Sequence, residues 1–161
     1  GAQRDAGDAP IALDPKKWIP LVCDAKVPLS HDTILLRLKL ESEGHQCGLP
    51  VGYHLYLRGD RNGKKVMRAY TPSSLNGTLG AVEFVIKIYF PNDHPNFPEG
   101  GQLTQYLNAV NVGDVVEVKG PMGHIKYAGC GRLLVDKNEH IIDKMIPRVV
   151  MCGTAQCILS K

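Results

Sequence analysis

The chain has 161 residues, of which 43% are hydrophobic and 22% charged, and its formal net charge is +3 at pH 7. This composition predicts one globular domain and excludes a disordered chain, because enough apolar residues are present to build a core. Lysine and arginine residues do not gather into a large cluster, so no nucleic-acid partner is expected. No apolar run approaches the roughly 20 residues that cross a bilayer, so no membrane segment is expected.

Five cysteines occur at irregular spacing, and no recognisable signal peptide precedes them. This pattern is typical of reduced thiols rather than a disulfide framework, so we expect a cytoplasmic protein. Cys152 and Cys157 lie close together in the sequence, but no second pair and no histidine accompanies them. The sequence therefore predicts no metal site.

Strand patterns dominate the chain after residues 1–14, which are small and polar and are typical of a linker or tail. The predicted strands cover residues 18–28, 33–40, 52–59, 64–71, 81–90 and 113–121. The segment Asp60-Arg61-Asn62-Gly63 lies between the third and fourth strands and predicts a hairpin. Short strands separated by glycine, proline and asparagine indicate an antiparallel barrel or sandwich, so the predicted fold class is all-β.

One short helix is predicted over residues 100–110, where Leu103, Tyr106 and Leu107 form an apolar stripe. Gly100 and Gly101 precede it and allow the backbone to approach a ligand closely. The free N–H groups of a first helical turn bind anions. The sequence therefore predicts an anion site where this helix begins.

Arg68, Tyr70 and Thr71 stand where a predicted strand ends. Arg68 and Tyr70 are two residues apart and share one face of the strand. A guanidinium there can hold a diphosphate through two hydrogen bonds, beside a ring that packs on a flat heterocycle. The spacing alone favours the simpler interpretation, a surface arginine that forms ion pairs beside a half-buried tyrosine.

Two further candidates have simple structural alternatives. Lys87 lies in the apolar strand "VIKIYF", where a lone lysine often only extends its amine to solvent. Phe97 lies between two prolines in a loop and is either a small satellite core residue or a lid over a ligand.

The strand "RVVMCG" near the end of the sequence runs into Gly153, Thr154 and Ala155. A strand that opens into such a loop is how an α/β nucleotide-binding unit begins. We expect residues 132–161 to form a connector and the first strand of a truncated α/β domain, the rest of which is absent from this chain.

Four motifs in order, "RAYTPSS", "VIKIYF", "HPNFPEGGQLTQYL" and "GPMGHIKY", resemble the flavin-binding half of the cytochrome b5 reductase family. "LPVGYHLYL" and "GHIKY" look most like the FAD segment of eukaryotic assimilatory nitrate reductase. The resemblance covers about residues 17–131. It implies a six-stranded antiparallel Greek-key barrel with one short helix over residues 15–131, with FAD on its surface.

The resemblance also implies roles for individual residues. Arg68 would clamp the FAD diphosphate, Tyr70 would pack beside the flavin, and Thr71 would reach flavin N5. Thr71 and Lys87 would be catalytic, with Lys87 facing the nicotinamide nucleotide, and Phe97 would contact the adenine half. The full set of expected cofactor-binding residues is Arg68, Ala69, Tyr70, Thr71, Val85, Ile86, Lys87, Ile88, Tyr89, Phe97, Gly101, Gln102, Leu103 and Thr104.

The end of the chain departs from the family pattern. The family continues with a Gly-Gly-Thr-Gly-x-Thr-Pro loop and an NAD(P)H-binding domain, whereas this sequence reads Cys152-Gly153-Thr154-Ala155. An alternative match is the family's later Cys-Gly-Pro-Pro segment, but the prolines are missing. We therefore do not assign Cys152 as the cysteine near the nicotinamide.

The function that the resemblance implies is electron transfer from NAD(P)H through FAD to a haem acceptor, either cytochrome b5 or a fused haem domain, as in nitrate reductase or cytochrome b5 reductase. The alternative is a non-catalytic flavin-binding or interaction module that lacks the NAD(P)H domain. A barrel without flavin that serves protein contacts is the third option.

Overall fold

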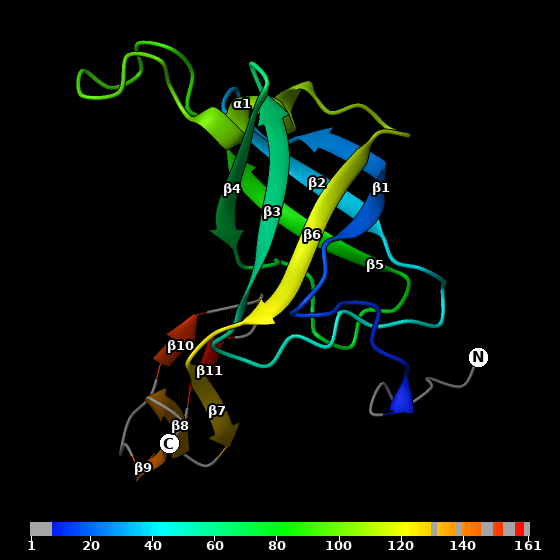
Figure 1. The fold of residues 1–161 in the computed structure, drawn as a ribbon, viewed down its shortest axis with the longest axis vertical. Helices are drawn as coiled ribbons and strands as arrows, with labels where there is room; N and C mark the ends of the chain where they lie inside the picture. The colour runs from blue at the N-terminus through cyan, green and yellow to red at the C-terminus, as the bar shows by residue number, and fades with distance from the viewer. Residues whose placement is uncertain (1–7, 130–131, 138–139, 146–149, 153–156, 160–161) are drawn as a thin grey trace.

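The computed structural model describes residues 8–129, 132–137, 140–145, 150–152 and 157–159. Six strands form one antiparallel sheet that curls on itself, in the order β4-β3-β6-β1-β2-β5 (Figure 1). Their bounds are β1 Ile19–Pro28, β2 Thr33–Lys39, β3 His54–Arg61, β4 Lys64–Tyr70, β5 Ala81–Lys87 and β6 Val115–Met122. The last strand of this sheet, β6, lies between β3 and β1, which is Greek-key connectivity. The predicted all-β, six-stranded antiparallel fold is confirmed.

The inner face of the sheet carries the core. Leu36 on β2 and Phe84 on β5 are register partners, and neither side chain is exposed to solvent. Val116 and Val118 on β6 are equally buried, whereas Val115 on the same strand points to solvent and is exposed. The period-2 alternation seen in the sequence therefore separates the buried face from the solvent face, as predicted.

The β3–β4 hairpin turns at Asn62 and Gly63, whose φ angles are 53° and 74°. Arg61 and Lys64 pair on either side of them, so the turn has two residues. Two consecutive left-handed residues define a type I′ turn, which matches the right-handed twist of the strands and explains the Asn-Gly sequence. The predicted hairpin is confirmed.

The edge strands β4 and β5 are joined by the residues that follow β4. The N–H of Ser73 donates to the carbonyl of Glu83 at 2.8 Å. The N–H of Glu83 donates to the Ser74 hydroxyl at 3.1 Å. Ser73 and Ser74 thus join the two edge strands next to the end of β4. Further along, the edges of β4 and β5 remain open.

Helix α1, Gln102–Ala109, connects β5 to β6 across the end of the sheet (Figure 1). Leu103 and Leu107 are buried, and Tyr106 packs so closely on Gly59 of β3 that a Cβ there would lie 2.2 Å from its ring. Lys26 donates to the carbonyls of Asn108 and Val110 at the other end of the helix. These contacts fix both ends of α1, and the predicted apolar stripe is confirmed.

The remaining strands form two small sheets. Strands β7 Ile125–Gly129, β8 Arg132–Lys137 and β9 His140–Met145 make a three-stranded antiparallel sheet, and β10 Val150–Cys152 pairs with β11 Cys157–Leu159. Only a connector was expected before β10 from the sequence, because strands of six residues or fewer carry too few alternating positions to be recognised. The predicted loop at residues 153–156 lies outside the described residues.

Candidate functional site

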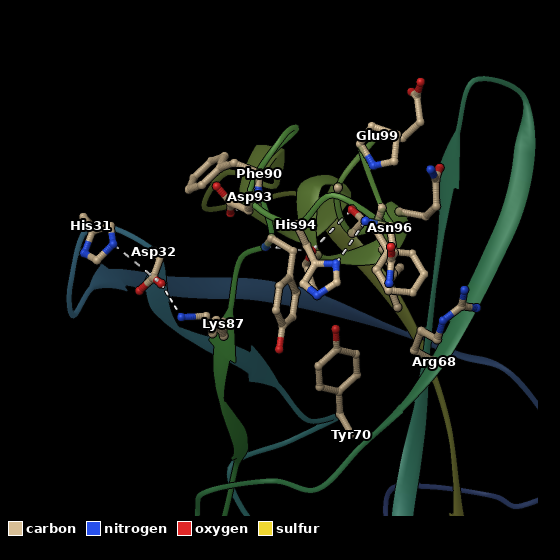
Figure 2. A pocket seen from close by; sticks show the side chains of 18 residues that line it. His31, Asp32, Arg68, Tyr70, Lys87, Phe90, Asp93, His94, Asn96 and Glu99 are labelled. Carbon is tan, nitrogen blue, oxygen red and sulfur yellow. Dashed lines mark hydrogen bonds and ion pairs between the residues drawn. The ribbon is translucent and has the colours of Figure 1, made fainter.

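A pocket of about 1010 Å³ opens between β4, β5, the loop after β5 and the start of α1 (Figure 2). It brings together most of the residues expected at a cofactor site, although they come from three separate stretches of sequence. Those that line it are Arg68, Tyr70, Lys87, Tyr89, Phe97, Gly101, Gln102, Leu103 and Thr104. The curled sheet thus assembles one site from motifs more than 30 residues apart.

Arg68 and Tyr70 form the wall on β4, and Tyr70 points into the pocket (Figure 2). The ring of Tyr70 meets that of Phe84 edge-on, with 6.5 Å between centroids. Burial raises the pKa of the Tyr70 hydroxyl, which therefore stays protonated and can donate a hydrogen bond. Arg68 is exposed and donates to its neighbour's carbonyl, Met67 O, at 2.7 Å. No carboxylate in the described part of the chain forms an ion pair with Arg68, so its charge is available to a ligand.

The opposite wall is the turn that begins α1. Gly101 is the N-cap, no side chain caps the helix, and its first turn contains no acidic residue. The N–H groups of Gln102, Leu103 and Thr104 find no acceptor within residues 8–129. A helix N-terminus of this kind carries partial positive charge and free donors. It is therefore complementary to an anion lying between it and Arg68.

The turn requires its glycines. Gly100 has φ of 71°, and a Cβ there would lie 2.5 Å from the carbonyl oxygen of Tyr89. A Cβ on Gly101 would lie 2.2 Å from Oγ1 of Thr104. That hydroxyl accepts from the N–H of Tyr89 and donates to the carbonyl of Gly101, each at 3.3 Å. The chain therefore folds back tightly here, with its backbone at the pocket surface.

Aromatic rings are exposed around the pocket. Tyr89 is 50% and Phe97 66% exposed, and Phe97 lies against His94 with 5.5 Å between ring centroids. Phe97 is therefore no core residue, which removes one of its two interpretations. Exposed rings beside a cavity are surfaces on which a flat ligand can stack.

Lys87 stands at the far side of the pocket and pairs with Asp32, with 2.5 Å between Nζ and Oδ2. The hydroxyls of Ser30 and Thr33 also donate to Asp32. The Lys87 amine holds the pKa of the Asp32 carboxyl well below its usual range, and Asp32 in turn raises the pKa of Lys87. Both groups are charged at neutral pH. Asp32 was missed by the sequence analysis, since only the β2–β5 register brings it to Lys87.

The other expected site residues do not line the pocket. Ala69, Thr71 and Val85 are exposed next to it. Ile86 and Ile88 point into the core with 1% exposure each, so only their backbone atoms can face a ligand. Strand alternation explains this difference, because consecutive side chains of residues 85–89 point to opposite faces.

Comparison with known proteins identifies the family. The family described as "Oxidoreductase FAD-binding domain" matches residues 20–127. The chain belongs to this FAD-binding family. Nitrate reductase [NADH] 1 of Phaseolus vulgaris is 46% identical over 125 residues, which are 78% of this chain and 14% of that protein. NADH-cytochrome b5 reductase 2 of Gallus gallus is 44% identical over 139 residues, 86% of this chain and 46% of that protein.

A solved structure agrees with this FAD-binding assignment. The cytochrome b5 reductase domain of Ulva prolifera nitrate reductase superimposes with a TM-score of 0.77 at 41% identity, covering 86% of this chain and 51% of that one. The chain therefore spans less than half of the length of these two curated relatives and about half of the solved structure.

The residues of the pocket fit FAD. A dinucleotide needs positive charge and N–H donors for its diphosphate, and both Arg68 and the uncapped start of α1 offer them. It needs apolar surface for its ring systems, and Tyr89 and Phe97 expose it. The volume of about 1010 Å³ lies at the upper end of ordinary ligand pockets, as a large cofactor requires.

Proposed function

We propose that this FAD-binding chain is the flavin module of an NAD(P)H-dependent oxidoreductase that passes electrons through FAD to a haem acceptor. The observation that carries the proposal is the pocket, which is lined both by the uncapped start of α1 and by Arg68, an arginine without an ion-pair partner among the described residues. The names of the similar proteins, a nitrate reductase [NADH] and an NADH-cytochrome b5 reductase, support the donor and the acceptor. The acceptor is a fused haem domain or cytochrome b5.

Binding and orientation are the work of the chain's own residues. Arg68 and the N–H groups of Gln102 to Thr104 hold the diphosphate, with the Thr104 hydroxyl beside them. Tyr70 and Tyr89 pack along the flavin, with the exposed Val85 next to them. Phe97 contacts the adenine half. Such positioning groups act by fixing the geometry of the reactants rather than by performing the redox chemistry.

Thr71 and Lys87 are the proposed catalytic residues. The Thr71 hydroxyl donates to flavin N5, and the Lys87 ammonium, held by Asp32, faces the nicotinamide nucleotide. When bound, FAD supplies the capacity to accept a hydride and to release electrons one at a time.

The same proposal extends to the organisation of the chain. Residues 15–131 form the FAD-binding barrel, residues 1–14 a linker or tail, and residues 132–161 a connector and the start of an NAD(P)H-binding domain. No helix in the described part of the chain is long and apolar enough to cross a membrane. On the separate ground of the cysteine pattern, we propose that the protein acts in the cytoplasm.

Two reductants test the proposal on the 161-residue polypeptide. Added FAD should bind and show flavin absorbance that dithionite bleaches at once. NADH should bleach it far more slowly, because we expect the nucleotide to be positioned mainly by a second domain, and positioning can account for roughly 7–11 kcal/mol of a barrier. The absence of FAD binding by this polypeptide would contradict the proposal. Rapid bleaching by NADH would show that the barrel alone suffices.

A further inference from the structure

Arg61, at the tip of the β3–β4 hairpin, reaches the turn that begins α1 from behind. Its Nη1 donates to the carbonyl oxygens of Gly101 and Gln102 at 3.3 and 3.4 Å, and its Nη2 donates to Oε1 of Gln105 at 3.0 Å. Gly101 and Gln102 line the pocket, but Arg61 does not. The arginine therefore touches the wall of the site and not its interior.

These two carbonyls belong to the peptide groups whose N–H donors face the site. The Gly101 carbonyl shares a peptide plane with the N–H of Gln102, and the Gln102 carbonyl shares one with the N–H of Leu103. In a trans peptide the C=O and N–H bonds point in opposite directions. A guanidinium that holds both carbonyls on one side thus orients both N–H groups to the other side, and it polarises them through the peptide dipole.

The charge of Arg61 does not serve the helix itself. A cation at a helix N-terminus is unfavourable, because that end already carries partial positive charge. Among residues 8–129, the Arg61 charge is compensated neither by an acidic residue in the first turn of α1 nor by an ion pair. An anion in the pocket would attract both the Arg61 charge and the partial positive charge of the helix N-terminus. The arrangement is therefore suited to an anionic ligand.

Contacts within the hairpin hold the backbone on either side of Arg61. Two residues earlier, Gly59 fits under the ring of Tyr106, which anchors β3 to α1. One residue later the two-residue turn begins, and the Asp60 carboxylate accepts from the N–H of Gly63 at 3.0 Å. The backbone of Arg61 is therefore held by contacts on both sides of it in the sequence.

We propose that Arg61 is a positioning residue for FAD: it orients and polarises the N–H groups of Gln102 and Leu103 that receive the diphosphate, without touching the cofactor. This inference rests on the proposed function. Truncating Arg61 should weaken FAD binding by about tenfold, as expected for the loss of one charge-assisted interaction. Riboflavin, which has no diphosphate, should bind equally well with and without Arg61.

The test compares dissociation constants for FAD and riboflavin in the wild-type chain and in Arg61→Ala, Arg61→Lys, Arg68→Ala and Arg37→Ala. Arg37 is the matched control, an exposed arginine of β2 that pairs with Asp24 and Glu83 away from the pocket. We expect the Lys variant to recover part of the FAD affinity, because it keeps the charge but not the fork. Thermal melting of each chain without FAD shows that the variants fold.

The outcomes separate the two proposals. Absence of FAD binding by the wild-type chain would overturn the proposed function, and the role of Arg61 with it. If Arg68→Ala weakens FAD while Arg61→Ala binds it like wild type, only the role of Arg61 is overturned. Equal losses for FAD and riboflavin in Arg61→Ala would show a merely structural role and overturn the inference as well.

Discussion

Arg68 is the residue whose removal should affect the cofactor most directly. It lines the pocket and has no acidic partner among the described residues. Arg68→Ala should weaken FAD binding by about 2 kcal/mol, the typical contribution of a hydrogen bond to a charged group. Arg68→Lys should restore only part of this, because an ammonium cannot form two parallel bonds. Flavin titration measures both, and wild-type affinity in the Ala variant would exclude a diphosphate role.

Cys47 is predicted to be chemically inert in the folded protein. Its side chain is buried, and burial raises the pKa of the thiol to about 12. Alkylation requires the thiolate, so iodoacetamide at neutral pH should leave Cys47 unmodified until denaturant is added. Peptide mapping by mass spectrometry reads the label at each cysteine. Rapid labelling of Cys47 without denaturant would mean that this region opens in the native state.

Some residues of the site could be predicted from the sequence, and others could not. Arg68 and Tyr70 lie two apart in one strand, so their common face followed from local spacing. Their place at a cofactor site was implied by the family resemblance. Asp32 and Arg61 reach the site through contacts 55 and 40 residues away along the chain. Strand register and helix docking create such contacts, and no local pattern records them.

At the scale of elements, several strands and the helix could be predicted because they have a clear period. Strand β2 and strand β6 alternate over seven and eight residues, and α1 carries its stripe at helical spacing. The short strands β8 and β9 could not, since six residues offer only three inward positions. Predictions were therefore most successful where burial of one face selects the period.

The β3–β6 pair makes a prediction about pH. Arg58 donates two hydrogen bonds to its register partner Glu117, at 2.7 and 2.8 Å, and its guanidinium lies 4.1 Å from the ring centroid of Trp18. These bonds lower the pKa of Glu117 below its ordinary value of 4.5. A lowered carboxyl pKa stabilises the fold above 4.5, and this contribution is lost as the pH falls through the folded-state value.

Glu117→Gln should therefore lower the free energy of unfolding at neutral pH by at most about 1 kcal/mol, because the pair is partly exposed. The difference from wild type should shrink as the pH falls below 4.5. Urea unfolding at several pH values measures it. A difference that stays constant across this range would mean that Glu117 contributes by something other than its charge.

On the scale of the whole molecule, the Greek-key order places the site at the open edge of the curled sheet. Strands β4 and β5 are the two ends of the strand order, yet Ser73 and Ser74 bring their ends together at Glu83. Helix α1 then closes the remaining gap with its uncapped N-terminus directed at it. Within the described part of the chain, the fold thus leaves N–H donors without an acceptor and an arginine without an ion-pair partner around one cavity.

FAD should consequently stabilise the whole domain, because the folded state alone assembles this cavity from β4, β5 and α1. At a concentration of 100 times the dissociation constant, FAD should add about 2.7 kcal/mol to the free energy of unfolding. For a domain of this size that corresponds to a rise in Tm of roughly 5–10 °C.

In Arg68→Ala the same FAD concentration should add only about 0.9 kcal/mol, if affinity falls by the expected 2 kcal/mol. The control Arg37→Ala should keep the full wild-type shift. Thermal melting with and without FAD measures all three, and equal shifts in wild type and Arg68→Ala would show that FAD binds elsewhere.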